Sequence, residues 1–208
     1  MINIYNMDCM EAMKDMSDNQ FDLAIVDPPY GIGANKEKQH NGWKDYGHKE
    51  WDNKIPEKKY FIELFRISKN QIVWGGNYMT EYLKASMGWI LWDKGQRDFS
   101  LADGELAWTS FHRALRIFDM PRGAALADAN NNGGKIHATQ KPVKLYEWLL
   151  MNYAKEGDTI LDTHLGSGSI AIACHNLGYD LTGYEIDKDY YEAAQKRIKE
   201  HQSQLRIL

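Results

Sequence analysis

The chain has 208 residues, of which 43% are hydrophobic, and this length is enough for one globular domain with a full core. Its formal net charge of −4 excludes a global basic field, so a nucleic-acid partner would need a local positive surface. Cys9 and Cys174 lie far apart without a CxxC pattern, which favours reduced, buried thiols over a zinc site or a disulfide. There is no long apolar run, and residues 1–5 carry no cationic signal segment. We therefore expect a cytoplasmic protein without a membrane span or a metal.

Apolar periodicity predicts alternating strands and helices, which is typical of a doubly wound, mostly parallel α/β sheet. The expected strands are 2–5, 23–26, 71–74, 89–92, 105–111, 159–162 and 180–184. The expected helices are 8–16, 60–67, 79–85, one that starts near 142, 170–177 and 189–202. A long loop at 31–59 and a turn-rich segment at 112–135 interrupt this rhythm. We treat residues 1–208 as a single domain.

The first motif is the apolar run Leu23-Ala24-Ile25-Val26, which continues into Asp27-Pro28-Pro29-Tyr30. The run suits a strand buried on both faces, and each proline holds the residue before it extended. Neither proline has an N–H, so the Asp27 carboxylate and the Pro28 carbonyl form two acceptors with no local donor between them. An exocyclic amino group fits such a pair, and the Tyr30 ring offers a face on which a base could stack. Taken alone, these four residues could also be an ordinary strand-to-loop turn.

The second motif starts at the predicted strand 159–162, which is followed by Gly166-Ser167-Gly168 and a helix. The next strand ends at Glu185, about 20 residues after the first glycine. In nucleoside-binding units the glycines admit the ligand to the backbone, and the acid accepts hydrogen bonds from ribose hydroxyls. The sequence from Gly166 also satisfies GxGxxA, so NAD is an alternative ligand. Because both motifs follow strands of one parallel sheet, we expect them at the same edge.

Together the motifs resemble the N6-adenine/N4-cytosine family of DNA amino-methyltransferases, of the restriction-modification or phage and prophage type. Asp27-Pro28-Pro29-Tyr30 resembles the catalytic motif, and Leu165-Gly166-Ser167-Gly168 resembles the S-adenosylmethionine loop. His137-Ala138-Thr139-Gln140-Lys141-Pro142 resembles the segment before the cofactor-side helix. The catalytic motif comes first, which is the order of the family's permuted beta group. The chain departs from the family at Thr163-His164, where Pro-Phe is usual, and at Ala138, where Pro is usual.

The resemblance implies a Rossmann-like S-adenosylmethionine-dependent methyltransferase fold with a circularly permuted motif order. It implies methyl transfer to N6 of adenine in double-stranded DNA, with the target base flipped out of the helix. The implied catalytic residues are Asp27, Pro28, Pro29 and Tyr30. The implied cofactor contacts are Asp8, Cys9, Asp27, Thr139, Gln140, Lys141, Asp162, His164, Leu165, Gly166, Ser167, Gly168 and Glu185. Members of the family often form homodimers.

Local basic residues are the expected DNA contacts, because the chain as a whole is acidic. The 31–59 loop combines lysines with aromatic residues, which suits backbone tracking and base stacking. The 112–135 segment is interpreted as a short target-recognition insert. The expected contacts are Lys36, Lys38, Lys44, Arg113, Arg116 and Arg122. By composition alone, both segments could equally be solvated surface.

Other functions stay open at this point. N4-cytosine is the alternative target in DNA, and related acid/proline/aromatic motifs also serve RNA methyltransferases. Protein glutamine methylation is less favoured, because its motif usually begins with Asn. A non-catalytic module that binds DNA or the cofactor, and an NAD-dependent enzyme, are alternatives from other classes.

Overall fold

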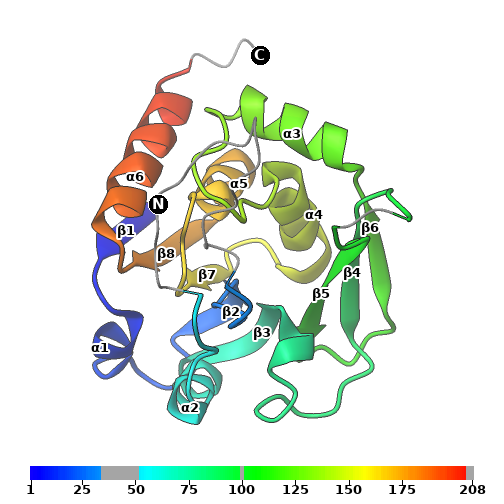
Figure 1. Cartoon of the computed structure of the whole chain (residues 1–208). Coiled ribbons are helices and arrows are strands. Elements are labelled where there is room, and N and C mark those ends of the chain that lie inside the picture. The colour runs from blue at the N-terminus through cyan, green and yellow to red at the C-terminus, as the bar shows by residue number, and fades with distance from the viewer. Residues whose placement is uncertain (34–51, 99–100, 205–208) are drawn as a thin grey trace.

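The computed structural model describes residues 1–33, 52–98 and 101–204. In these ranges, one sheet of eight strands has helices on both faces (Figure 1). Its strands are β1 (Ile2–Asn6), β2 (Phe21–Val26), β3 (Ser68–Trp74), β4 (Trp89–Asp93), β5 (Gly104–Thr109), β6 (Arg116–Asp119), β7 (Thr159–Asp162) and β8 (Asp180–Glu185). The helices are α1 (Cys9–Met13), α2 (Lys58–Ile67), α3 (Arg122–Asn131), α4 (Val143–Tyr153), α5 (Ser169–Leu177) and α6 (Lys188–Ser203), with a 3₁₀ turn η1 (Gly76–Tyr78).

The order of the strands across the sheet is β1-β8-β7-β2-β3-β5-β4-β6. Strands β1, β8, β7, β2 and β3 are mutually parallel. Strand β5 runs antiparallel to both β3 and β4, whereas β6 runs parallel to β4. Every strand in this sheet except β5 therefore ends at the same edge. The predicted mostly parallel α/β fold is confirmed.

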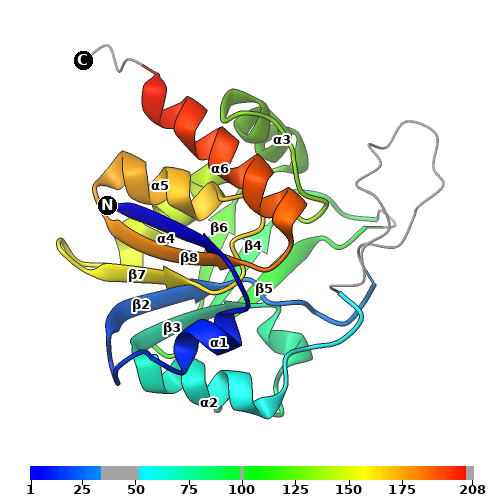
Figure 2. The same cartoon turned by 90° about the vertical axis from the view of Figure 1, so that its left-hand side faces the viewer.

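The sheet is buried on both faces, and β2 shows why its sequence is a continuous apolar run. Helices α4, α5 and α6 cover one face and α1 and α2 cover the other (Figure 2). Leu23 and Ile25 of β2 belong to the cluster under α4 and α5. Ala24 and Val26, which point the other way, belong to the cluster under α1 and α2. All four side chains are at most 1% exposed.

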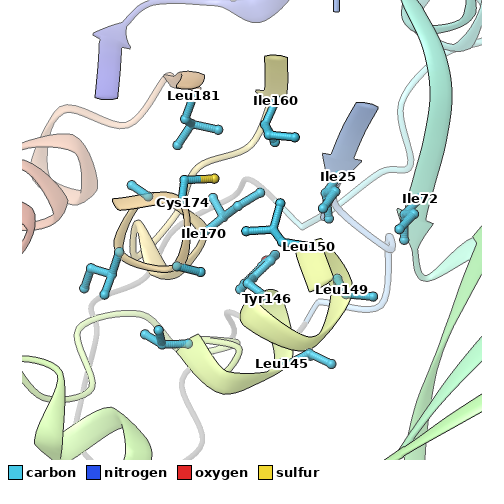
Figure 3. Packing of buried hydrophobic residues seen from close by; sticks show 14 of the residues in the cluster. Ile25, Ile72, Leu145, Tyr146, Leu149, Leu150, Ile160, Ile170, Cys174 and Leu181 are labelled. Atoms are coloured by element: carbon cyan, nitrogen blue, oxygen red, sulfur yellow. The ribbon is translucent and has the colours of Figure 1, made fainter. Parts of the chain in front are cut away.

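The larger core cluster lies between the sheet and the pair α4 and α5. Figure 3 shows side chains from both helices and from four strands converging in this layer. Leu149 of α4 and Ile170 of α5 are 0% and 1% exposed. Helix α5 is closed by Gly178, which adopts φ +79. This packing holds the start of α5, and so the glycine loop before it, in place.

Two expectations about chain organisation differ from the structure. The helix predicted at 79–85 is absent, because that segment forms turns after η1 in which Tyr82 and Leu83 both bond back to Met79. The 112–135 segment does not interrupt the sheet, since it supplies β6 as a partner of β4 and then forms α3. The remaining predicted strands and helices are present with small shifts at their ends.

Candidate active site at the ends of strands β2 and β7

The two motifs lie side by side. Strands β2 and β7 are parallel neighbours, with Leu23 opposite Ile160 and Ala24 opposite Leu161. Asp27 and the loop after Asp162 therefore leave the sheet at the same edge. From β2 the chain continues through α2 to β3, and from β7 it continues through α5 to β8 on the opposite face. This is a topological switch point, the place where open α/β sheets bind ligands.

The Asp27 carboxylate lies in a buried network of hydrogen bonds. One carboxylate oxygen accepts the Tyr30 hydroxyl at 2.7 Å, and the other accepts the Lys141 ammonium at 2.5 Å. Burial raises the pKa of Asp27, the nearby Lys141 charge opposes this, and the Glu105 charge adds to it. The sequence analysis identified no donor for the Asp27 carboxylate, and the structure supplies two. The donors come from Tyr30, three residues on, and from Lys141, 114 residues on.

Lys141 also reaches a second carboxylate. Its ammonium lies 3.2 Å from Glu105 of β5, and Glu105 in turn bonds Lys94 at 2.5 Å. Burial works against ionisation of Glu105, but Lys141 and Lys94 outweigh it and lower the pKa of Glu105 to about 2. Asp27, Lys141, Glu105 and Lys94 thus form a chain of contacts in which carboxylates and ammonium groups alternate.

The Tyr30 ring, which was expected to stack on a base, contacts two other residues of the protein, Tyr78 and Gly75. It stacks on Tyr78 with ring centroids 5.3 Å apart and planes 19° apart. It also lies against Gly75, where a β-carbon would come within 2.2 Å of the ring. Tyr78 is 45% exposed, so the outer ring of this stacked pair is open to solvent.

The turn after Asp27 is held by a residue that sequence reasoning missed. One oxygen of Asp52 accepts the backbone N–H groups of Tyr30 and Gly31 at 2.7 and 2.9 Å. Asp52 is 1% exposed and lies 22 residues from Tyr30. These two N–H groups follow the double proline, which itself lacks donors, so Asp52 supplies the acceptor that shapes the corner.

The glycine loop after β7 is shaped for close approach. Gly166 and Gly168 have φ values of +52° and +71°, which favour glycine. Glu185 at the end of β8 accepts the N–H groups of Gly166 and Asp187 at 2.8 and 2.9 Å. Burial raises the pKa of Glu185 and these bonds oppose the rise. Each carboxylate oxygen has two lone pairs, so Glu185 retains acceptors for hydroxyl groups.

Asp162 and His164 form the wall between the two motifs. Asp162 accepts the His164 backbone N–H at 2.9 Å, and burial raises the Asp162 pKa to about 8. The His164 ring nitrogen lies 2.9 Å from the Thr163 hydroxyl, which also bonds the Tyr60 hydroxyl at 2.6 Å. Burial lowers the His164 pKa to about 4, so the ring is neutral at pH 7.

The segment before α4 borders the same loop. The His137 ring lies beside Gly166, where a β-carbon would be 3.8 Å away, and packs at a tilt of 56° against the Tyr190 ring, with centroids 4.3 Å apart. Thr139 is exposed and its hydroxyl lies 3.2 Å from the His137 ring nitrogen. Gln140 accepts the Ile136 N–H and donates to the Gly134 carbonyl, so its side chain shapes the local turn.

The remaining predicted site residues cap a helix, pack in the core or bond neighbouring elements. Asp8 caps α1 by accepting the Met10 N–H at 2.8 Å. Cys9 is buried, and burial raises its pKa to about 12, which argues against a nucleophilic thiolate. The Ser167 carbonyl accepts Arg197 of α6 at 2.7 Å, and Leu165 is 4% exposed.

The three predicted arginines do not share one surface. Arg122 follows the end of β6 and lies at the edge where Asp27 leaves the sheet. Arg116 begins β6, and Arg113 bonds the Asn152 carbonyl at the end of α4, so both lie toward the opposite edge. The predicted contacts Lys36, Lys38 and Lys44 lie outside the described residues.

Comparison with known proteins identifies the family that this chain resembles. The profile of N6_N4_Mtase, a DNA methylase family, matches residues 109–196. The Type II methyltransferase M.HpaI of Haemophilus parainfluenzae is 27% identical over 236 residues, covering 91% of this chain and 71% of that protein. M.HinfI of Haemophilus influenzae is 26% identical over 240 residues, covering 93% and 67%. The resemblance to the N6/N4 DNA methylases is confirmed.

Further matches agree on fold and class. M2.DpnII of Streptococcus pneumoniae, also a Type II methyltransferase, is 31% identical over 146 residues, and the chain spans about half its length. The crystal structure of an M1.HpyAVI–SAM complex covers 95% of this chain and all of its own, with a TM-score of 0.61 and 22% identity. The cytosine-N4-specific PvuII DNA methyltransferase covers 100% and 88%, with a TM-score of 0.62 and 13% identity. The sequence matches support a DNA methyltransferase of the N6/N4 class, and the structural matches show its fold.

The described residues lack two features, a helix that could span a membrane and a cluster that could hold a metal ion. None of the helices in residues 1–33, 52–98 and 101–204 is long and apolar enough to cross a membrane. The same ranges contain no group of three or more His, Cys, Asp or Glu side chains placed to hold a metal ion.

Proposed function

We propose that this chain is an S-adenosylmethionine-dependent DNA methyltransferase that methylates the exocyclic N6 of adenine. The observation that carries the proposal is the adjacency of the Asp27 corner and the Gly166 loop at the parallel ends of β2 and β7. A methyl donor in the loop and an amine at the corner would lie on the same edge. Adenine is preferred over N4 of cytosine, because Asp27-Pro28-Pro29-Tyr30 resembles the adenine form of the motif more closely.

The residues around the glycine loop fit the cofactor. Gly166 and Gly168 open the backbone to a ligand, and Glu185 is anchored by two backbone N–H groups with acceptors to spare for ribose. His164 and Leu165 would form part of the pocket wall. M1.HpyAVI, which has a similar fold, was crystallised with SAM. Bound S-adenosylmethionine would supply an electrophilic methyl group on a sulfonium centre.

The chain's own residues would prepare the amine. The lone pair of the adenine amino nitrogen is delocalised into the ring, which makes it a weak nucleophile. Hydrogen bonds from its two N–H groups to the Asp27 carboxylate and the Pro28 carbonyl would draw the nitrogen toward tetrahedral geometry and free the lone pair. Asp27 would then stabilise the positive charge that develops on the nitrogen. The base must leave the duplex to reach this corner, so base flipping is part of the proposal.

DNA would approach the edge where the strands end. Arg122, Lys94 and Lys135 are neighbours there: burial lowers the pKa of Lys135, and the charges of Arg122 and Lys94 lower it further. We expect Arg122→Ala to weaken binding to all DNA sequences and to reduce the slope of log K against log salt by about 1. Arg116→Ala is a matched control, because Arg116 is also exposed but begins β6 at the other edge. Equal losses in both variants would contradict this placement.

The test of the proposed function is methylation of mixed-sequence DNA, followed by digestion and identification of the methylated nucleoside. N6-methyladenine supports the proposal, and N4-methylcytosine would move the target to cytosine. Transfer to RNA alone, or no transfer with wild-type protein, would refute it. Asp27→Ala should reduce transfer by about 10²–10³-fold or more. Its melting temperature should still rise with S-adenosylmethionine. Asp15→Ala, which removes an exposed carboxylate in the turn after α1, is the control and should keep full activity.

A further inference from the structure

The acceptor that the proposed reaction needs is occupied in this structure. The Lys141 ammonium lies 2.5 Å from one oxygen of Asp27, and the Tyr30 hydroxyl lies 2.7 Å from the other. The side chains of Lys141 and Asp27 are 2% and 17% exposed. An amine that bonds to Asp27 must therefore share an oxygen with one of these donors or displace it, and Lys141 is the charged one.

A displaced ammonium needs another anion, because an unpaired buried charge is strongly unfavourable. Glu105 lies 3.2 Å from the same Lys141 nitrogen and comes from β5, which is separated from the Asp27 strand β2 by β3. The move from Asp27 toward Glu105 is short and stays within the site. The faces of Trp74 and Tyr30 lie 5.1 and 5.6 Å from the ammonium, and such rings favour a cation.

The charge that forms during the proposed reaction also favours a movement of Lys141 from Asp27 toward Glu105. During the proposed reaction the amine nitrogen becomes cationic, and a second cation bonded to Asp27 would oppose this. Shifting Lys141 to Glu105 frees the Asp27 charge for the forming cation while keeping the lysine paired. Lys94 lies 2.5 Å from the other oxygen of Glu105, so Glu105 can pair with both ammonium groups at once.

We propose that Glu105 is a positioning residue that accepts the Lys141 ammonium when the target amine takes its place on Asp27. This role rests on the proposed methyl transfer. It assigns a function to a carboxylate on β5 that neither motif contains. Lys141 acts as a removable placeholder for the amine, and Glu105 makes its removal possible.

The test compares steady-state methyl transfer in three variants and the wild type. Glu105→Gln keeps the shape of the side chain but removes the second anion, so we expect kcat to fall at least 10-fold. The KM for S-adenosylmethionine should change less than 2-fold. Glu105→Asp should recover part of kcat. Glu63→Gln, which breaks the Glu63–Arg66 pair on α2, is the control and should not change kcat.

The possible results distinguish a failure of the placeholder role from a failure of the proposed function. Wild-type kcat in Glu105→Gln would overturn the placeholder role while leaving the proposed function intact. If Glu105→Gln folds poorly, Glu105→Asp decides: a lowered kcat with an unchanged melting temperature supports the role, whereas a loss of kcat that only follows a loss of folded protein would overturn it. Absence of methyl transfer in the wild type would instead refute the proposed function itself.

Discussion

The His164→Phe substitution should make the protein less sensitive to acid. His164 packs edge-on against Tyr60, with ring centroids 5.3 Å apart, and its ring nitrogen bonds the Thr163 hydroxyl. A phenyl ring is similar in size, and Thr163 keeps its bond to the Tyr60 hydroxyl at 2.6 Å. The substitution therefore removes one titrating group and leaves the packing largely in place.

The magnitude follows from the lowered pKa. Burial lowers the pKa of His164 from 6.5 to about 4, so the unfolded chain binds a proton at pH 5 that the folded chain does not. Linkage then makes folding less favourable as pH falls from above 6.5 toward 4. For these two pKa values the full effect between pH 7.5 and pH 5 is about 2 kcal/mol. Because part of the ring is exposed to solvent, we expect about 1–2 kcal/mol.

The assay is urea unfolding followed by tryptophan fluorescence at pH 7.5 and pH 5.0. The wild type should lose about 1–2 kcal/mol more free energy of unfolding than His164→Phe between these conditions. His112→Gln, at an exposed position in a turn, should behave like the wild type. If wild type and His164→Phe lose the same amount, then the imidazole is not buried in its neutral form and this reasoning is wrong.

Three further substitutions, with Met151→Ala as a control, test the packing and the proposed cofactor site. Gly75→Ala should destabilise the fold by about 1–2 kcal/mol and reduce methyl transfer. The reason is that the Gly75 φ of +67° suits glycine and that a β-carbon there would clash with the Tyr30 ring. Wild-type activity in this variant would contradict the prediction. Leu149→Ala should cost about 2–5 kcal/mol in urea unfolding. Met151→Ala on the same helix, where the side chain is 63% exposed, should cost less than about 0.5 kcal/mol, and similar losses would argue against the described core. Glu185→Gln should reduce the rise in melting temperature that S-adenosylmethionine produces, and an unchanged rise would remove Glu185 from the cofactor site.

The parts of the site that the sequence predicted are those set by local chain geometry. Asp27 and Gly166 each follow a short apolar strand, and a parallel sheet brings the ends of such strands to one edge. The strand pairing of β2 with β7 confirms this for the two motifs. The apolar run of β2 also correctly indicated burial on both faces, since alternate residues enter different core clusters.

The parts that the sequence missed depend on contacts between distant segments. Glu105 joins the site only because β5 runs antiparallel and starts at the edge where the other strands end. Asp52 reaches Tyr30 from the end of the long loop, in a stretch where charged residues looked like solvated surface. A signal existed for Lys141, which belongs to a recognised motif, but its bond to Asp27 spans 114 residues and has no local pattern.

The 112–135 segment illustrates a different limit. Its arginines and turn residues indicated an insert separate from the sheet, yet β6 pairs with β4 and α3 follows directly. The composition of a segment indicates only how polar it is. Strand β6 has four residues and one partly buried side chain, so its sequence has little apolar pattern that could predict a strand.

The end of helix α3 and the Gly166 loop are joined by a buried arginine, which couples the positions of the two segments. Arg197 of α6 is 3% exposed and donates to the Asn132 carbonyl after α3 at 2.5 Å. It also donates to the Ser167 carbonyl and the Ser169 hydroxyl of the glycine loop at 2.7 and 3.1 Å. A displacement of α3 would therefore be transmitted through Arg197 to the Gly166 loop. Because the guanidinium is planar and its donors are fixed relative to each other, small displacements at Asn132 cannot be absorbed without changing the bonds at Ser167.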